Sequence, residues 1–158
     1  MLQSFFPLPK QFFSSAVAWS LAAIFLWYFG GRELGAVFGL QFPDEDADPV
    51  IGLGHFTTHD FIWFYIYYSV LTIIFYGFWA NYAPHKWQLW SILGSALILF
   101  FTYFQVQVAV AVNNWYRPFY DAIQNALSNE STTTAGDLYG YMFSFLILAM
   151  TYVLFSVL

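Results

Sequence analysis

Four long runs without a charged residue constrain this chain more than any other feature of its sequence. They cover residues 11–31, 61–83, 87–116 and 138–158. Each meets the ~18 apolar residues that a transmembrane helix needs. Backbone polar groups in lipid must be hydrogen-bonded within the chain, which favours helices over open strands. We therefore predict an all-α, polytopic membrane protein with four spans.

The low share of charged residues supports this interpretation. Only 8% of the 158 residues are charged and 60% are hydrophobic, whereas a soluble domain carries about 25% charged residues. Most of the surface is therefore expected to face lipid. Four Lys and Arg residues make no basic footprint, so nucleic acid is not an expected partner. The absence of cysteine excludes disulfides and thiolate metal sites.

The first run is predicted to be a retained anchor rather than a signal peptide. Lys10 precedes an uncharged stretch from Gln11 to Phe29, which is longer than the apolar region of a signal peptide. The stretch ends in aromatic residues and glycines, without the small residues of a cleavage site.

Three connections of different character separate the runs. Residues 32–60 form an acidic loop with the sequence PDEDADP at its centre, and residues 84–86 are short enough for only a tight turn. The third connection, 125–137, offers Thr134 or Asp137 as a cap for the last helix. The third run is longer than a bilayer requires. It either tilts or continues as a helix beyond the membrane.

Basic residues predict the orientation of the spans. The positive-inside rule places Lys10 and Lys86 in the cytoplasm, with both termini inside and the acidic loop in the periplasm. Arg32 and Arg117 fall on the opposite side, so the count alone is a tie. Glu33 follows Arg32, whereas neither lysine has an acidic neighbour, and this favours the stated orientation.

Polar residues inside the third run are the first candidates for a functional site. Gln105 and Gln107 lie within the run, and Asn113 and Asn114 follow near its end. Polar groups at membrane depth usually face a partner or a water-filled cavity. Interhelical hydrogen bonding and lining of a substrate cavity are equally compatible with these four residues.

Acidic residues occur only at the edges of the runs. A proton relay within this chain would need one of three such residues, Asp60, Asp121 or Asp137.

The remaining clusters have plain structural interpretations. His55 and His59 have the i, i+4 spacing of a shared helix face, but a zinc site needs a third ligand. We interpret them as a polar segment that leads into the second span, with Thr58 or Asp60 as its cap. The glycines at 31, 35 and 39 predict either a short amphipathic helix or a packing seam. The small residues at 91 and 94–96 predict close helix packing.

No motif predicts an enzyme. The chain has no Gly-x4-Gly-Lys-Ser/Thr loop, no serine elbow and no paired-carboxylate cleft. No catalytic residue, metal or cofactor is therefore expected.

Three sequence strings resemble the SbmA/BacA family. They are SFFPLPK at residues 4–10, YAPHKWQLWSILGSA at 82–96 and VAVNNWYRPFYDAIQ at 110–124. The resemblance runs along nearly the whole chain and is weakest across the acidic loop. It implies an importer of peptides in the bacterial inner membrane, with antimicrobial peptides, microcins and bleomycin-like glycopeptides among its substrates.

The resemblance also implies an architecture. Members of the family are homodimers whose helices resemble the membrane domain of ABC exporters, but they have no nucleotide-binding domain and use the proton gradient. Residues 1–83 would be the added N-terminal pair of spans, and 84–158 the first two helices of the ABC-type core. Trp115 and Tyr116, within the third string, then join the candidates for the substrate cavity.

One departure and two alternatives accompany the resemblance. The spans contain no acidic residue to couple protons, and Gln107 is uncharged. The last run ends at Leu158 without a basic or aromatic stop, so we expect an N-terminal part of a longer protein, with proton coupling mostly in later residues. The alternatives are the membrane domain of an ATP-driven, ABC exporter-like system and an inactive fragment.

Overall fold

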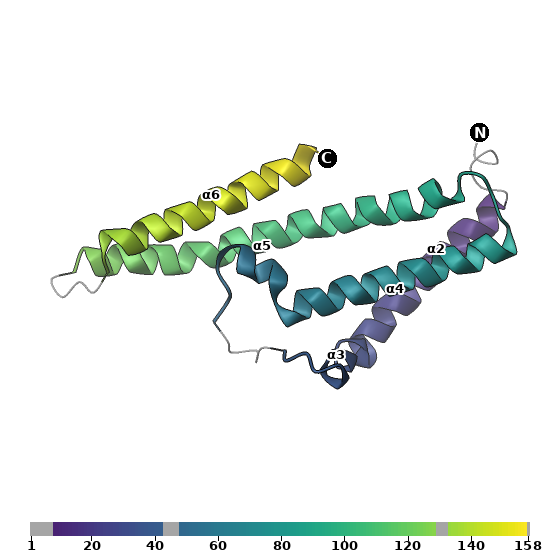
Figure 1. The fold of residues 1–158 in the computed structure, drawn as a ribbon, viewed down its shortest axis with the longest axis horizontal. Helices are drawn as coiled ribbons and strands as arrows, with labels where there is room; N and C mark the ends of the chain where they lie inside the picture. Colours follow the sequence, from purple (N-terminus) through teal and green to yellow (C-terminus); the bar gives the residue numbers. More distant parts are fainter. Residues whose placement is uncertain (1–7, 43–47, 129–132, 158) are drawn as a thin grey trace. The chain divides into compact units, whose positions relative to one another are not determined.

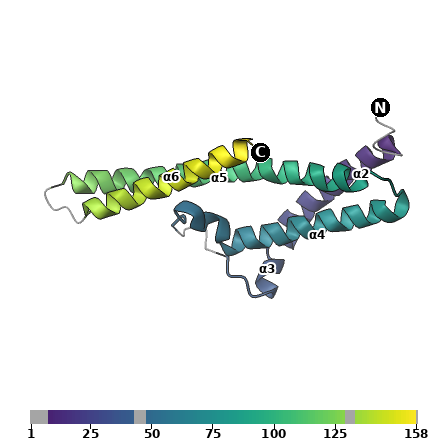
Figure 2. The same cartoon turned by 45° about the horizontal axis from the view of Figure 1, so that its top comes forward.

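The computed structural model describes residues 8–42, 48–128 and 133–157, and these ranges contain helices and no strand (Figures 1 and 2). Most of the 4–10 string, most of the centre of the acidic loop and Leu158 lie outside the described residues. The predicted all-α class is confirmed. Four helical segments are long and apolar enough to cross a membrane: Pro9–Gly31, His59–Tyr82, Trp90–Ala126 and Ala135–Val157.

The spans are built from four long helices and shorter helical pieces. The long helices are α2 (Pro9–Leu26), α4 (His59–Tyr82), α5 (Ser95–Ala126) and α6 (Ala135–Val157). A π-helical turn, η1 (Trp27–Gly31), follows α2, and another, η3 (Trp90–Gly94), precedes α5. The long connection carries the short helix α3 (Leu34–Val37) and the 3-10 helix η2 (Gly52–Thr57).

Helix α5 extends beyond the predicted third span. The run was predicted to end at Tyr116, but the helix continues without interruption to Ala126. The whole segment from Trp90 has 37 residues, or about 55 Å at 1.5 Å per residue, against a hydrocarbon core of ~30 Å. The helix thus continues past the apolar run, as the second of the two alternatives predicted.

A capping box sets the start of α6. The backbone N–H of Thr134 donates to Asp137 Oδ2 over 2.8 Å, and the N–H of Asp137 donates to Thr134 Oγ1 over 3.3 Å. This reciprocal pair satisfies the N–H of Thr134, and the N–H of Asp137 is shared between Thr134 Oγ1 and the Thr134 carbonyl, 3.1 Å away. Both residues proposed as caps take part, and α6 therefore begins at Ala135, before the apolar run.

The described chain divides into two compact units, and each is described by itself. The first unit contains residues 1–43 and 59–99. Its helices α2 and α4 are joined along their length by side chains of α4. Trp63 Nε1 donates to the Gly31 carbonyl (2.8 Å), Tyr67 Oη donates to the Ala23 carbonyl (2.6 Å), and Trp79 Nε1 donates to Ser15 Oγ (3.1 Å).

Glycines shape the connection after α2. Gly30 has φ +127°, a conformation that side chains rarely adopt, and the helix kinks there. Gly35 is buried in α3, where an added Cβ would collide with the ring of Phe42 and lie 3.0 Å from Trp63 Cγ. Gly31 and Gly35 thus allow close packing beside the short helix α3, whereas an added Cβ at Gly39 would meet nothing within 4 Å.

The second unit contains residues 44–58 and 100–158. Here α5 and α6 lie side by side in both views (Figures 1 and 2). Val108 and Ala111 of α5 and Leu148 of α6 are fully buried. The segment η2 also belongs to this unit. Its Phe56 ring lies 4.6 Å from Phe104, and Phe104 lies 4.3 Å from Phe155 of α6 (ring centroids).

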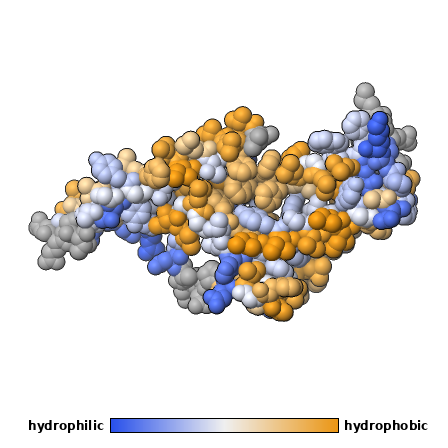
Figure 3. Space-filling model, viewed as in Figure 1, coloured by the Kyte–Doolittle hydropathy of each residue, from blue (hydrophilic) through white to orange (hydrophobic). Residues whose placement is uncertain are grey.

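Hydrophobic side chains cover much of the molecular surface in view (Figure 3). Val17 of α2, Ile73 of α4 and Met150 of α6 are each more than 60% exposed. Single exposed apolar residues are common, but rows of them along every long helix are typical of a protein surrounded by lipid. The predicted membrane protein is confirmed at this level.

Candidate functional site on helix α5

Two of the predicted cavity residues on α5 face α6. Gln105 Nε2 donates to the Phe155 carbonyl over 2.6 Å, and Trp115 Nε1 donates to the Tyr141 carbonyl over 2.8 Å. Trp115 is 5% exposed, and its ring lies 4.8 Å from that of Phe145. The interhelical alternative is therefore what the structure shows at Gln105.

Gln107 contacts the long connection instead of α6. Its side chain hydrogen-bonds to His55 of η2. Burial lowers the pKa of His55 below its ordinary value of 6.5, and the hydrogen bond to Gln107 opposes this shift in part. A neutral imidazole is thus favoured where η2 packs on α5.

The two histidines do not share a helix face. His55 ends up in the second unit, whereas His59 begins α4 in the first and its Nδ1 hydrogen-bonds to the backbone of Gln41. Thr58 between them is extended, with ψ 155°, and its hydroxyl donates to the His55 carbonyl rather than capping α4. No group of three metal-ligating residues occurs within the described ranges.

A row of polar and aromatic residues occupies the exposed side of the second half of α5. The row follows the spacing i, i+3, i+4, i+7, i+8, i+11, which is one face of a helix. All its members are exposed: Asn113, Tyr116, Arg117, Tyr120, Asp121 and Gln124. We call this row the α5 polar face.

Neighbouring side chains of the α5 polar face contact one another. The rings of Tyr116 and Tyr120 are stacked, with centroids 6.2 Å apart and planes 15° apart. Arg117 Nε lies 4.0 Å from Asp121 Oδ2. The face therefore presents phenol groups, an amide and both signs of charge along one line.

Asn114 adds an acceptor to this region. Pro118 lies inside α5 and has no N–H, so the Asn114 carbonyl receives no helical hydrogen bond from it. The side chain of Asn114 is half-buried, between the α5 polar face and the side that packs on α6.

The sequence interpretation found only part of the α5 polar face. Asn113 and Tyr116 were predicted as site residues, and Asp121 as an edge acid. Arg117, Tyr120 and Gln124 were not predicted as site residues because they lie beyond the apolar run. Continuing the spacing of three and four residues from Asn113 identifies all three.

Each of the three edge acids has a polar partner close to it in its own unit. Asp60 lies in the first unit, where its Oδ1 is 3.3 Å from Arg32 Nε. Asp121 pairs with Arg117, and Asp137 accepts hydrogen bonds from Thr134. Each carboxylate has its own local partner.

The chain was compared with known families. The model of the SbmA/BacA-like family matches residues 84–158. The match covers η3, α5, α6 and the whole α5 polar face, and it includes two of the three strings that carried the resemblance, the 82–96 string from Pro84 onward. The match covers just under half of the chain and supports the predicted family there, which is a family of transporters.

Proposed function

We propose that this chain is part of a secondary transporter that imports peptides across the bacterial inner membrane, because residues 84–158 match the SbmA/BacA-like family. The family match is the observation that carries the proposal. The four membrane-crossing helices supply the setting that such a transporter requires.

The α5 polar face supports peptides as the substrate class. A peptide backbone presents alternating donors and acceptors, and the amide of Asn113 and the phenols of Tyr116 and Tyr120 can serve both. Aromatic side chains also offer flat contact area at low cost in conformational entropy. Because the face is exposed, its contacts are individually weak, which suits a cargo that must leave again. Antimicrobial peptides, microcins and bleomycin-like glycopeptides are the proposed substrates.

We propose the proton gradient as the energy source and a homodimer as the working unit. Asp60 and Asp121 are candidate coupling groups because protonating either would release its arginine partner. Asp137 is the third candidate, and its protonation would weaken the cap of α6. Each event changes a local contact in response to one proton.

Uptake by living cells tests the transport function. Expression of the intact protein in a strain without peptide uptake is expected to sensitise the cells to a proline-rich antimicrobial peptide or to bleomycin. Replacing both Tyr116 and Tyr120 by Ala is expected to reduce this sensitivity about tenfold or more. The control Tyr139→Ala removes a 71% exposed tyrosine of α6 outside the α5 polar face and is expected to have little effect. Unchanged resistance despite membrane expression of the wild type would contradict the proposal.

The ATP-driven alternative makes a different prediction about energy. Under the proposal, a protonophore stops uptake while cellular ATP is held constant. Uptake that persists with the protonophore and follows the ATP level would favour the ABC exporter-like system instead.

A further inference from the structure

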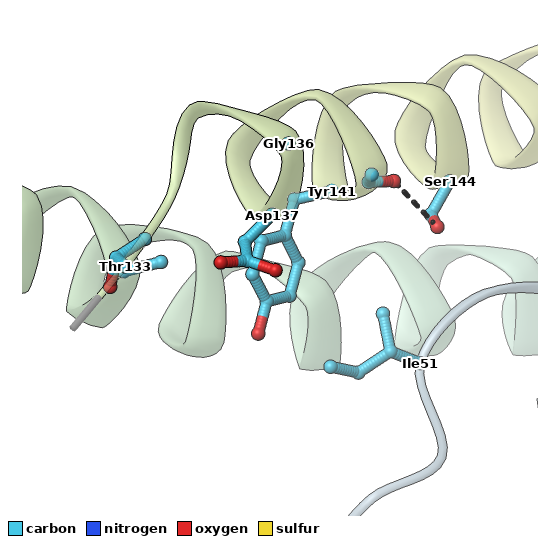
Figure 4. A pocket seen from close by; sticks show the side chains of 8 residues that line it. Ile51, Thr133, Gly136, Asp137, Tyr141 and Ser144 are labelled. Atoms are coloured by element: carbon cyan, nitrogen blue, oxygen red, sulfur yellow. Dashed lines mark hydrogen bonds between the residues drawn. The ribbon is translucent and has the colours of Figure 1, made fainter.

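The second unit carries an open hollow of about 520 Å³ at the start of α6 (Figure 4). Its walls come from three places in the chain. The first turns of α6 contribute Asp137 and Tyr141, α5 contributes Ala122, and the loop before η2 contributes Ile51. These segments all belong to the same compact unit.

Among the described residues that line the hollow, Asp137 has the one charged side chain. Both hydrogen bonds from Thr134, at 2.8 and 2.7 Å, reach the same carboxylate oxygen, Oδ2. Among the described residues, no hydrogen bond or ion pair reaches Oδ1. One oxygen of an exposed carboxylate therefore remains available to a ligand.

The helix backbone itself forms the floor of the hollow. Gly136 and Gly140 are one turn apart on α6 and both line it. A Cβ added at Gly140 would meet nothing within 4 Å, and one at Gly136 would meet only Thr134 Oγ1 at 3.6 Å. Packing within the described chain therefore does not occupy this space.

The remaining walls suit a long side chain with a charged end. Tyr141 follows Asp137 by four residues, so the two share a face of α6 (Figure 4). The Tyr141 ring is held edge-on against Phe119, with centroids 6.4 Å apart. Ile51 and Ala122 add apolar surface.

We propose that this hollow binds a basic side chain of the peptide cargo, arginine above all. The guanidinium would bind Asp137 Oδ1 and lie against the Tyr141 ring, with its methylene groups along Ile51 and Ala122. This inference rests on the proposed function and assigns part of its substrate specificity. The positive end of the α6 dipole offsets some of the carboxylate charge, so the preference for a cation is modest.

Direct binding to the intact protein in lipid nanodiscs tests the proposal. Two labelled peptides are compared by fluorescence anisotropy. They are identical except at one position, where one has arginine and the other has its neutral isostere citrulline. The wild type is expected to bind the arginine peptide about threefold to tenfold more tightly. Asp137→Asn is expected to bring the two dissociation constants within about twofold, while the Asn oxygen preserves the cap of α6.

A matched control and a second variant make the result specific. Asp48→Asn removes the same charge from an exposed position of the second unit that does not line the hollow, and it should keep the preference. Gly140→Leu fills the hollow without changing any charge and should abolish the preference. An equal preference in the wild type and in Asp137→Asn would overturn the proposal, as would a wild type that does not distinguish the peptides.

Uptake of the citrulline peptide separates this inference from the proposed function. Uptake without any arginine preference in binding would leave the transporter function standing and reject the hollow as its site. An arginine preference that depends on Asp137, with neither peptide taken up, would support the hollow and reject peptide import.

Discussion

Glycine and histidine illustrate how single residues control the long connection in this protein. Gly35 allows α3 to approach Trp63 closely, and His55 hydrogen-bonds to Gln107 where η2 packs on α5. The missing side chain of Gly35 leaves room for α3 beside α4, and the side chain of His55 bonds η2 to α5.

Gly35→Ala is expected to destabilise the first unit by about 1–3 kcal/mol, because the added methyl group must displace the rings of Phe42 and Trp63. The control is Gly77→Ala in the middle of α4, where an added Cβ meets nothing within 4 Å. That change should be neutral or stabilising by up to about 1 kcal/mol, because alanine favours a helix more than glycine does. Unfolding of the purified protein in detergent measures both, and equal effects would contradict the packing role of Gly35.

Docking of η2 is expected to weaken at acidic pH. Burial holds the pKa of His55 below 6.5 in the docked segment, so the undocked segment binds the proton more readily. Docking is therefore strongest above about pH 6.5 and weakens as the pH falls from there towards the pKa of the docked form. A spin label at Leu53→Cys should gain mobility between about pH 8 and pH 5. In His55→Gln this change should be absent, and a change that persists would assign the effect to another group.

At the scale of helices, prediction from sequence succeeded for the spans and for the cap at the start of α6. Uncharged runs identify α2, α4, α5 and α6 because lipid excludes charge. The end of α5 was left between two alternatives because Arg117 and Asp121 lie beyond the apolar run but are still helical.

Which segment each side of α5 contacts could not be predicted, because this depends on how the neighbouring segments are placed. The helical spacing puts Trp115 and Tyr116 on different sides of α5, but it does not show that Trp115 donates a hydrogen bond to the Tyr141 carbonyl. The contact between His55 and Gln107 joins segments that are far apart in the sequence, so it could not be predicted from the sequence either. The family strings identified the chemistry of the region but not these orientations.

The pairing of α5 with α6 should respond to Trp115. Trp115→Phe keeps an aromatic ring and loses the hydrogen bond to the Tyr141 carbonyl, at an expected cost of about 0.5–1.5 kcal/mol. Trp115→Ala also leaves a cavity and should cost about 3–5 kcal/mol. The control Trp90→Phe changes a tryptophan that is 70% exposed and should cost little. Unfolding in detergent gives the three values, and similar losses at both tryptophans would contradict the assigned contact.

For the molecule as a whole, the apolar surface that the described chain leaves exposed is suited to contact with lipid. Large apolar residues are exposed along every long helix, and charged residues lie near the ends of the spans.

Cysteine labelling is expected to place the two connections on opposite sides. The chain has no native cysteine, so single substitutions report without background. Lys86→Cys should react with a membrane-impermeant maleimide only after the membrane is opened. Asp48→Cys should react with the same reagent in intact, right-side-out inner-membrane vesicles, whose outer surface is the periplasmic face. The reverse pattern would invert the topology, and labelling of both from one side would contradict the span between them.

The hydrogen bonds of Trp63, Trp79 and Trp115 also allow contacts between segments to be followed by NMR spectroscopy. Each indole N–H is bonded to a neighbouring segment, Gly31, Ser15 and Tyr141 respectively. In a sample with nitrogen-15 in its tryptophans, these three signals should exchange slowly with solvent deuterium and report on separate contacts. A substrate that moves α6 against α5 would then alter the Trp115 signal while the signals of Trp63 and Trp79 remain as internal references.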